Sequence, residues 1–240
     1  MKTALITGAS KRLGAAIAVH LAERGYFVWI HYHSEQQAAE DLCDAIRRRS
    51  GNAAAVPADL SREDAIRRMF ETISADGGTC ELLINNASVF IPGKVDETSF
   101  DDWNRIMDVN LRAPWFCSVL AAPLMKKSGK GLIVNVVDSG ATKLWTKYAV
   151  YGISKQALLR LTQILAKTLG PDIRVNSISP GLILPSADTS AEEWKRLVGK
   201  TPLQKEGSPA DLLRALDFVL DSEYLTGADI VMDGGYRLVS

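Results

Sequence analysis

The amino-acid sequence predicts an α/β fold: a doubly wound sheet of seven mostly parallel strands, with helices on both faces. Two observations predict it. Short, nearly continuous apolar runs recur along the chain with helical segments between them, and strands that are apolar on both faces are typical of a parallel sheet covered on each side. The length of 240 residues suits one such sheet, because folds of this kind need no second core at this size. We therefore take residues 1–240 as one domain.

The expected elements follow in chain order. Residues 3–7 form the first apolar run, and a turn with two glycines leads from it into a helical segment that ends near Gly25. The later apolar runs are expected to be strands as well, at residues 26–32, 53–57, 82–85, 132–137, 173–178 and 229–232. Ligands of such sheets bind outside the carboxyl ends of the strands, so polar motifs at those ends are the candidates for a site.

Residues 183–207 differ from the rest of the chain. A polar, helix-like stretch that contains Trp194 lies between Pro185 and Pro202, and Gly207 follows. We expect this segment to be a mobile flap over a substrate. A simple surface excursion is the alternative.

The composition excludes several classes of protein. Twenty-eight basic and 28 acidic residues give a formal net charge of zero, and without a basic stripe we expect no nucleic-acid partner. No apolar run reaches the roughly 18 residues that a membrane span needs, and the chain enters a strand directly after Lys2, which leaves no room for a signal peptide. Cys43, Cys80 and Cys117 are widely spaced and odd in number, so buried thiols and a cytoplasmic location are expected.

The histidines limit the chemistry further. His20 belongs to the first predicted helix, and His31 and His33 lie at the end of the second predicted strand. None is placed to serve as a catalytic base or a metal ligand, so we expect neither triad hydrolysis nor zinc chemistry, and no metal site.

The glycine turn after the first strand predicts a phosphate-binding loop. In such a loop, backbone N–H groups and the positive end of the following helix meet a pyrophosphate. An ordinary turn with two glycines is the alternative, but the position on the first strand of an alternating chain favours binding and makes the sheet Rossmann-like. The candidate residues are Gly8, Ser10, Arg12, Leu13 and Gly14.

The end of the second strand favours NADPH over NADH. The adenosine 2′-hydroxyl is usually held by an acid at this point, yet none occurs here before Glu35, and Arg12 in the glycine turn can reach phosphate oxygens. The alternative is that Glu35 turns back to the ribose while Arg12 lies on the solvent side. The residues expected to surround the adenosine end are His31-Tyr32-His33-Ser34.

Tyr151 and Lys155 are four residues apart on one predicted helix and therefore share a face. A nearby ammonium favours phenolate, so we expect the pKa of Tyr151 to fall from about 10 toward neutrality. A tyrosine of that kind suits a general acid in carbonyl or imine reduction. A solvated helix face is the alternative for the pattern alone.

Together these features resemble the short-chain dehydrogenase/reductase family over essentially the whole chain. The matching motifs are Thr7-Gly8-x-x-x-Arg12-x-Gly14, Asp59, Asn85-Asn86-Ala87, Asn110, Tyr151-x-x-x-Lys155 and Pro180-Gly181.

The resemblance implies a role for each motif. Tyr151 would donate the proton, Lys155 would hold the ribose of the cofactor, and Asn110 would anchor a water that links Lys155 to solvent. The family usually forms homotetramers through the helices that carry Asn110 and Tyr151. The remaining cofactor contacts implied by the resemblance are Asp59, Leu60, Asn86, Ala87, Ser88, Pro180 and Gly181.

Asp138, thirteen residues before Tyr151, stands where the family ordinarily has a serine that orients a carbonyl. An ionised carboxylate only accepts hydrogen bonds, so it would repel a developing oxyanion but suit a heterocycle with N–H donors. If protonated, it would pass on a proton. Two alternatives remain open: Ser139 takes the serine role after a one-residue offset, or Asp138 is only a strand-end turn residue.

The chain also resembles pteridine reductases, a subgroup with this aspartate. The segments that carry the likeness are residues 10–14, 31–34 and 86–90. It implies that Phe90 stacks on a pterin, that Ser88 binds ring groups or phosphate, and that Arg12 touches both phosphate and pterin, with Leu182 also at the substrate. The chain departs from parasite pteridine reductases in being shorter and in having Ser34 where they have arginine, and Trp145 could narrow the pocket.

The sequence thus predicts an NADPH-dependent reductase that acts on dihydropterin or dihydrofolate-type rings. One alternative is a 3-oxoacyl-carrier-protein reductase or general carbonyl reductase of the same family, with Ser139 in the serine role. Another is a catalytically dead NADPH sensor, which is disfavoured because Asn110, Tyr151 and Lys155 are all present.

Overall fold

The fold follows the predicted order of strands. The computed structural model describes residues 2–75, 78–186 and 189–239, and within them seven parallel strands form one sheet in the order β3-β2-β1-β4-β5-β6-β7. Each strand lies within two residues of its predicted bounds, so the fold class is confirmed. The strands are β1 (Thr3–Ile6), β2 (Phe27–Tyr32), β3 (Asn52–Pro57), β4 (Leu82–Asn85), β5 (Gly131–Val136), β6 (Ile173–Pro180) and β7 (Asp229–Met232).

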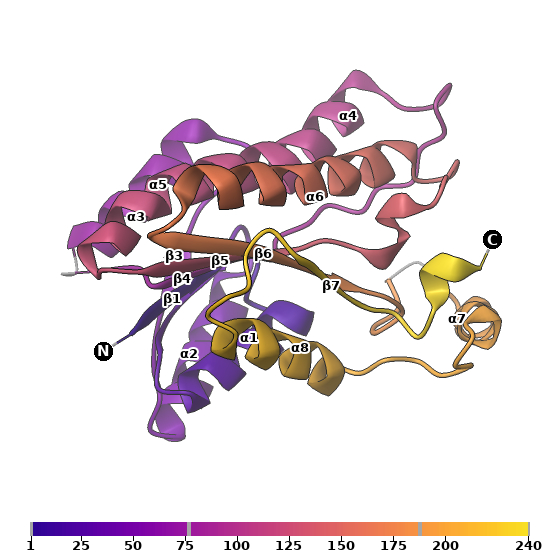
Figure 1. The fold of residues 1–240 in the computed structure, drawn as a ribbon. Helices are drawn as coiled ribbons and strands as arrows, with labels where there is room; N and C mark the ends of the chain where they lie inside the picture. The colour runs from indigo at the N-terminus through magenta and orange to yellow at the C-terminus, as the bar shows by residue number, and fades with distance from the viewer. Residues whose placement is uncertain (1, 76–77, 187–188, 240) are drawn as a thin grey trace.

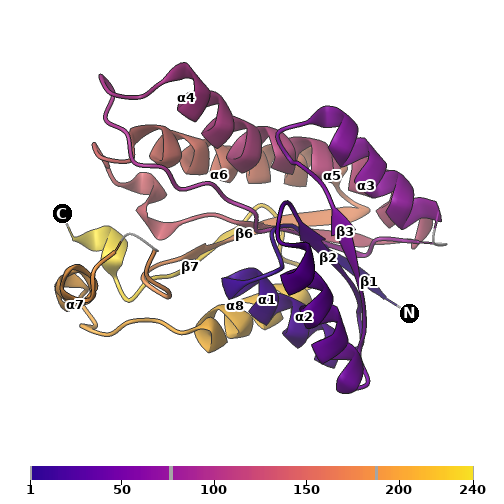
Figure 2. The same cartoon turned by 180° about the vertical axis from the view of Figure 1, so that it is seen from behind.

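Helices cover both faces of the sheet (Figure 1). One layer consists of α1 (Arg12–Glu23), α2 (Gln36–Arg48) and α8 (Pro209–Asp221), and the opposite layer of α3 (Glu63–Ala75), α4 (Phe100–Met107), α5 (Ala113–Lys127) and α6 (Ala149–Leu169). The view from behind shows the same two layers, with α7 (Ala191–Lys200) apart from both, beyond the sheet (Figure 2). This helix is the polar stretch predicted within residues 183–207, of which residues 187 and 188 lie outside the described residues.

The core consists of two apolar clusters, one on each face of the sheet. Successive strand residues point to opposite faces, so that Leu83 and Ile133 pack with α3, α5 and α6, whereas Ile84 and Val134 pack with α1 and α8. All four side chains are fully buried, and each contributes roughly 1.5–3 kcal/mol relative to exposure. Burial on both faces explains why the strands read as apolar runs without alternation.

The three cysteines are free thiols buried in these clusters, as predicted. No helix in the described part of the chain combines the length and the apolar character required to cross a membrane.

Candidate active site

A cavity of about 1150 Å³ opens at the carboxyl ends of the strands. Every predicted site residue except Asn110 lines it, although these residues come from six strand ends and two helices. The lining includes Gly8, Ser10, Arg12, Leu13, Gly14, His31, Tyr32, His33, Ser34, Asp59, Leu60, Asn86, Ala87, Ser88, Phe90, Asp138, Tyr151, Lys155, Pro180, Gly181 and Leu182. No group of histidine, cysteine or acidic side chains suited to a metal ion occurs in residues 2–75, 78–186 and 189–239.

The glycine loop is packed too tightly for side chains at two positions. Gly8 has a φ of +62°, and a Cβ there would lie 2.9 Å from the Cα of Ala87. A Cβ on Gly14 would lie 2.4 Å from the carbonyl oxygen of Gly8. The Asn86 side chain donates from Nδ2 to the carbonyls of Thr7 (2.9 Å) and Gly8 (3.0 Å), so it fixes the loop shape from behind. The loop therefore presents bare backbone at the amino end of α1, as a phosphate cradle requires.

His31 also holds the glycine loop in place, through a hydrogen bond to its backbone. Its Nδ1 accepts a hydrogen bond from the Gly8 N–H (2.9 Å), and its Nε2 lies 3.0 Å from the carbonyl oxygen of Ala58. One partner is a donor and the other an acceptor, so the ring must be neutral with its proton on Nε2. Burial lowers the pKa of His31 to about 4. This residue joins the glycine loop to the end of β3 and does so only while uncharged.

Arg12 reaches across the cavity to the predicted flap. Its backbone has a φ of +55°, a conformation uncommon for a residue with a side chain. Its guanidinium Nη2 donates to the carbonyl oxygens of Pro185 (2.8 Å) and Leu184 (3.3 Å). The alternative in which Arg12 only faces solvent is thus wrong for this structure, because the side chain links the glycine loop to the 183–207 segment.

The end of the cavity predicted to hold adenosine carries a cation, Lys11, that was not predicted as a site residue. Lys11 forms an ion pair with Glu35, so the acid that could have turned back to a ribose hydroxyl is paired with a cation instead. Asp59 accepts hydrogen bonds at Oδ1 from the N–H (2.9 Å) and hydroxyl (2.7 Å) of Ser61, and its Oδ2 lies 3.9 Å from Nε2 of His33. The Lys11–Glu35 spacing along the chain gave no signal of this pair.

Asp138 is in direct contact with Tyr151. The tyrosine hydroxyl donates to Oδ2 of Asp138 at 2.8 Å, while Oδ1 accepts the Gly140 N–H at 2.7 Å and caps the short helix Ser139–Thr142. Asp138 is therefore both a turn residue and the partner of Tyr151. Burial raises its pKa and so favours the protonated form.

The predicted fall in the Tyr151 pKa is wrong. Burial, followed by the neighbouring Asp138, raises the pKa of this phenol well above its usual value. Lys155 lies with its Nζ 5.8 Å from the centre of the tyrosine ring and donates to the carbonyl oxygen of Val136 at 3.0 Å. Burial lowers the pKa of Lys155 itself to about 8. Helical spacing alone could not show that Lys155 donates to the Val136 carbonyl oxygen, or that the Tyr151 hydroxyl donates to the Asp138 carboxyl group.

Ser139 does not meet Tyr151 in this structure. Its side chain is 3% exposed, and its hydroxyl has no hydrogen-bond partner within the described ranges. Of the two candidates for the family's serine position, Asp138 is the one that contacts Tyr151.

Asn110 lies behind the cavity wall, fully buried, in a π-helical turn (Asp108–Arg112) between α4 and α5. Its Nδ2 donates to the Val89 carbonyl (2.9 Å) and to the Ser154 hydroxyl (3.1 Å), and its Oδ1 accepts the Val89 N–H (2.7 Å). The Ser88 hydroxyl also donates to this oxygen, at 3.3 Å. Asn110 therefore fastens the end of β4 to α6, and Ser88 has a protein partner here.

Aromatic rings surround the Asp138–Tyr151 pair. Phe90 meets Tyr151 edge to face with ring centres 4.7 Å apart, and it stacks on Tyr148 at 4.2 Å. Trp145 lies parallel to Tyr151 at 6.0 Å, and its ring centre also lies 6.2 Å from that of Tyr148 and 6.5 Å from that of Tyr236. Tyr148 and Tyr236 were not among the predicted site residues. A tyrosine directly after Gly234-Gly235 was the available signal for the second, because two glycines after the last strand permit a sharp return of the chain.

A parallel sheet with a glycine loop on its first strand, and a buried tyrosine and lysine one helical turn apart over its carboxyl ends, defines a class of oxidoreductase. Residues 8–237 match the family model described as Enoyl-(Acyl carrier protein) reductase. The chain belongs to the short-chain dehydrogenase/reductase family, as the sequence predicted.

Several relatives are similar over nearly their whole length. Glucose 1-dehydrogenase 2 of Bacillus subtilis is 31% identical, covering 99% of this chain and 95% of the relative. The 3-oxoacyl-[acyl-carrier-protein] reductase FabG of Staphylococcus aureus is 28% identical, with coverage of 98% and 97%. Among solved structures, FolM Alternative dihydrofolate reductase 1 of Brucella canis, complexed with NADP, is 34% identical with a TM-score of 0.94, covering 100% of this chain and 95% of that one.

Proposed function

We propose that the protein is an NADPH-dependent reductase that reduces dihydropterin or dihydrofolate-type rings. The observation that carries this proposal is the Asp138 carboxyl group, 2.8 Å from the Tyr151 hydroxyl, where a carbonyl reductase needs a hydrogen-bond donor. A carboxyl group here suits a nitrogen heterocycle, because it accepts N–H bonds when ionised and supplies a proton when neutral. The similarity to a dihydrofolate reductase of the same family supports the same substrate class.

The residues of the cavity fit a phosphorylated dinucleotide. The bare glycine loop at the amino end of α1 suits the pyrophosphate, while Lys11, His33 and Ser34 suit an additional phosphate at the adenosine end. Pairing of Glu35 with Lys11 removes the acid that would otherwise favour an unphosphorylated ribose. When bound, NADPH supplies the hydride.

The proton comes from the Asp138–Tyr151 pair in this proposal. The raised pKa of Asp138 extends the pH range over which its carboxyl group holds a proton, and Tyr151 holds the carboxyl group in position through its hydroxyl. A ring nitrogen that accepts the proton would lie against these two groups. Lys155 would hold ribose hydroxyls, and Asn110 would keep the Val89 backbone in place beside the ring and join the proton path through a water.

The flat ring would lie against Phe90, whose 40% exposure leaves one face open to the cavity. Ser88 would bind ring groups after release from Asn110, Arg12 would contact phosphate and ring, and Leu182 would close the far side. The 183–207 segment would act as the flap, since Leu184, Trp194 and Leu197 line the cavity from it.

The test is NADPH oxidation with dihydrobiopterin and dihydrofolate, measured beside an acetoacetyl thioester and a simple diketone near pH 5 and pH 7. Pterin turnover well above thioester turnover is the expected result. Thioester turnover without pterin turnover would instead identify a 3-oxoacyl-carrier-protein or general carbonyl reductase. That second function is favoured by the matched family model and by FabG.

Lys11→Met is expected to raise the KM for NADPH by about tenfold and to leave the KM for NADH nearly unchanged. Only NADPH has a 2′-phosphate with which Lys11 can form a charge-assisted hydrogen bond. Steady-state kinetics with both cofactors measures this. Lys147→Met is the matched control, since Lys147 lines the cavity at the Tyr148 end. An equal change in KM for both cofactors would show that Lys11 does not bind the 2′-phosphate.

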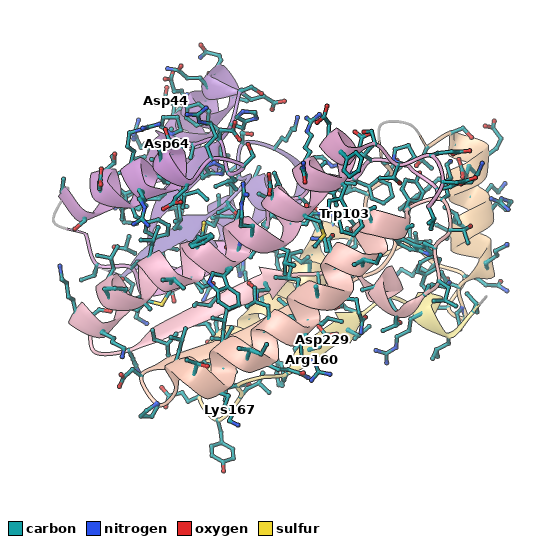
Figure 3. The ribbon with its side chains drawn as sticks, turned by 90° about the horizontal axis from the view of Figure 1, so that it is seen from above. Asp44, Asp64, Trp103, Arg160, Lys167 and Asp229 are labelled. Carbon is teal, nitrogen blue, oxygen red and sulfur yellow. The ribbon has the colours of Figure 1, made fainter. Side chains whose placement is uncertain are left out.

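We propose that the protein forms a homotetramer and that the outer surface of the α4–α6 layer is an interface between its subunits. Five large apolar side chains are 42–51% exposed there, and Figure 3 looks onto this layer and shows Trp103 on it. Such exposure is typical of an interaction surface. The other residues are Trp115 and Val119 on α5, and Ile153 and Ile164 on α6.

Trp115→Glu is therefore expected to reduce the molar mass measured by light scattering. Val95→Glu, in an exposed loop outside these helices, is the control and should leave the mass unchanged. A monomeric wild-type protein would contradict the assembly. The buried thiols suit a reducing compartment, and we propose the cytoplasm.

A further inference from the structure

Tyr236 enters the cavity from the C-terminal end of the chain. It begins the short helix Tyr236–Leu238 after β7, which Figure 1 shows in yellow close to α7 and past the end of the sheet. Gly234 and Gly235 have φ values of +58° and +85° and turn the chain back. A Cβ on Gly235 would lie 2.5 Å from Pro202, so this turn is packed against the end of the 183–207 segment.

Several contacts fix the position of the Tyr236 ring. Asp233 accepts the N–H groups of Gly235 (2.9 Å) and Arg237 (2.8 Å). Lys143 donates from Nζ to the Tyr236 carbonyl oxygen at 3.0 Å and lies 3.9 Å from the centre of its ring. The ring is thus held before any substrate arrives, and a pre-positioned group loses little freedom when it binds a ligand.

The hydroxyl of Tyr236 remains available as a donor. Burial and the nearby Asp138 raise its pKa, so the phenol keeps its proton. Within the described residues, no protein group accepts the Tyr236 O–H. A donor with a fixed ring therefore stands on the wall of the same cavity as the Asp138 carboxyl group.

We propose that Tyr236 binds the substrate and sets its specificity, by donating a hydrogen bond to an acceptor on the ring beside the N–H or nitrogen that Asp138 contacts. A carboxyl group and a phenol that line the same cavity match a ring edge on which donor and acceptor atoms alternate. Cyclic amides and aminopyrimidinones have such an edge, whereas a simple ketone has nothing to offer the second group. This inference rests on the proposed function, because it concerns how the same site selects its heterocycle.

Tyr236→Phe tests the inference because it removes only the hydroxyl. The KM for dihydrobiopterin is expected to rise about tenfold, with kcat little changed, since a bond to the bound ring is lost while the proton-donating pair stays intact. The kcat/KM for a simple monoketone and the Kd for NADPH, followed by fluorescence, are expected to stay within about twofold. Arg237→Ala, which alters an exposed neighbour on the same short helix, is the matched control.

The outcomes separate the two proposals. Pterin turnover by the wild type with an unchanged KM in Tyr236→Phe would overturn the inference and leave the function standing. An equal loss for pterin and monoketone would also overturn it, because Tyr236 would then only support Trp145. No pterin turnover by the wild type would overturn both. A selective loss for pterin, absent from Arg237→Ala, would support the inference.

Discussion

Replacement of Asp138 by asparagine is expected to lower kcat for a dihydropterin by about 10²- to 10⁴-fold, the range for loss of a positioned general acid. Asparagine keeps nearly the same shape and an oxygen that can still accept the Gly140 N–H or the Tyr151 hydroxyl. It cannot carry a transferable proton at accessible pH. The variant therefore separates proton donation from the structural role of the residue.

The role of Asp138 as a proton donor also predicts the direction in which kcat changes with pH. Because the pKa of Asp138 is raised, its protonated fraction is greatest in acid and falls as the pH increases through that raised value. Wild-type kcat should therefore decline with rising pH, and this decline should be absent from Asp138→Asn. Stopped-flow or steady-state rates across the acid and neutral range measure it.

Ser139→Ala is the matched control because the two residues are adjacent and the Ser139 hydroxyl has no partner in the part of the chain that is described. Its kcat should remain close to the wild-type value. A large loss in Ser139→Ala together with a small loss in Asp138→Asn would assign the serine role to Ser139 and favour a carbonyl reductase.

Acidification from pH 6.5 to 4 is expected to remove about 3 kcal/mol of folding stability through His31 alone. Its pKa is lowered from 6.5 to about 4 in the folded chain, so between these values the unfolded state binds the extra proton. Stability is thus fully present above pH 6.5 and falls by about 1.4 kcal/mol per pH unit until the folded pKa is reached. Urea unfolding at a series of pH values measures the slope.

His31→Gln is the informative variant. Glutamine can still donate and accept, but it does not titrate, so the steep part of the profile should flatten between pH 6.5 and 4. His33→Gln is the control, since the His33 side chain is 66% exposed. If the His31→Gln profile kept the wild-type slope, other groups would be responsible for the acid sensitivity. Protonation of His31 would also leave the Gly8 N–H without its acceptor, which weakens the glycine loop.

The sheet could be predicted well because its signals are local. Leu83 and Ile84 point to opposite faces and are both fully buried, so a run of such residues identifies a strand without knowledge of its neighbours. The same is true of Gly8 and Gly14, whose positions in the turn follow from the strand before and the helix after them. The residues that line the cavity at strand ends could be listed for this reason.

The electrostatics of the site could not be predicted, because they depend on which groups meet in space. Tyr151 and Lys155 share a helical face as expected, yet the lysine is drawn to the Val136 carbonyl and the tyrosine to Asp138. Lys11 and Glu35 pair across two chain segments, and Tyr236 arrives from beyond the last strand. Each of these contacts depends on the tertiary arrangement and leaves no mark in local spacing.

The π-helical turn at Asp108–Arg112 lets Asn110 bind the Val89 backbone without changing how the helices on either side pack. Such a turn contains one residue more than an α-helical turn, and α4 and α5 continue on either side of it. The flanking helices keep their buried faces, with Cys117, Ala121 and Met125 recurring at four-residue spacing. The additional residue is therefore absorbed locally, where it aims Asn110 at the end of β4. A single-residue change in chain length would be enough, over evolutionary time, to add or remove this attachment without rebuilding the core.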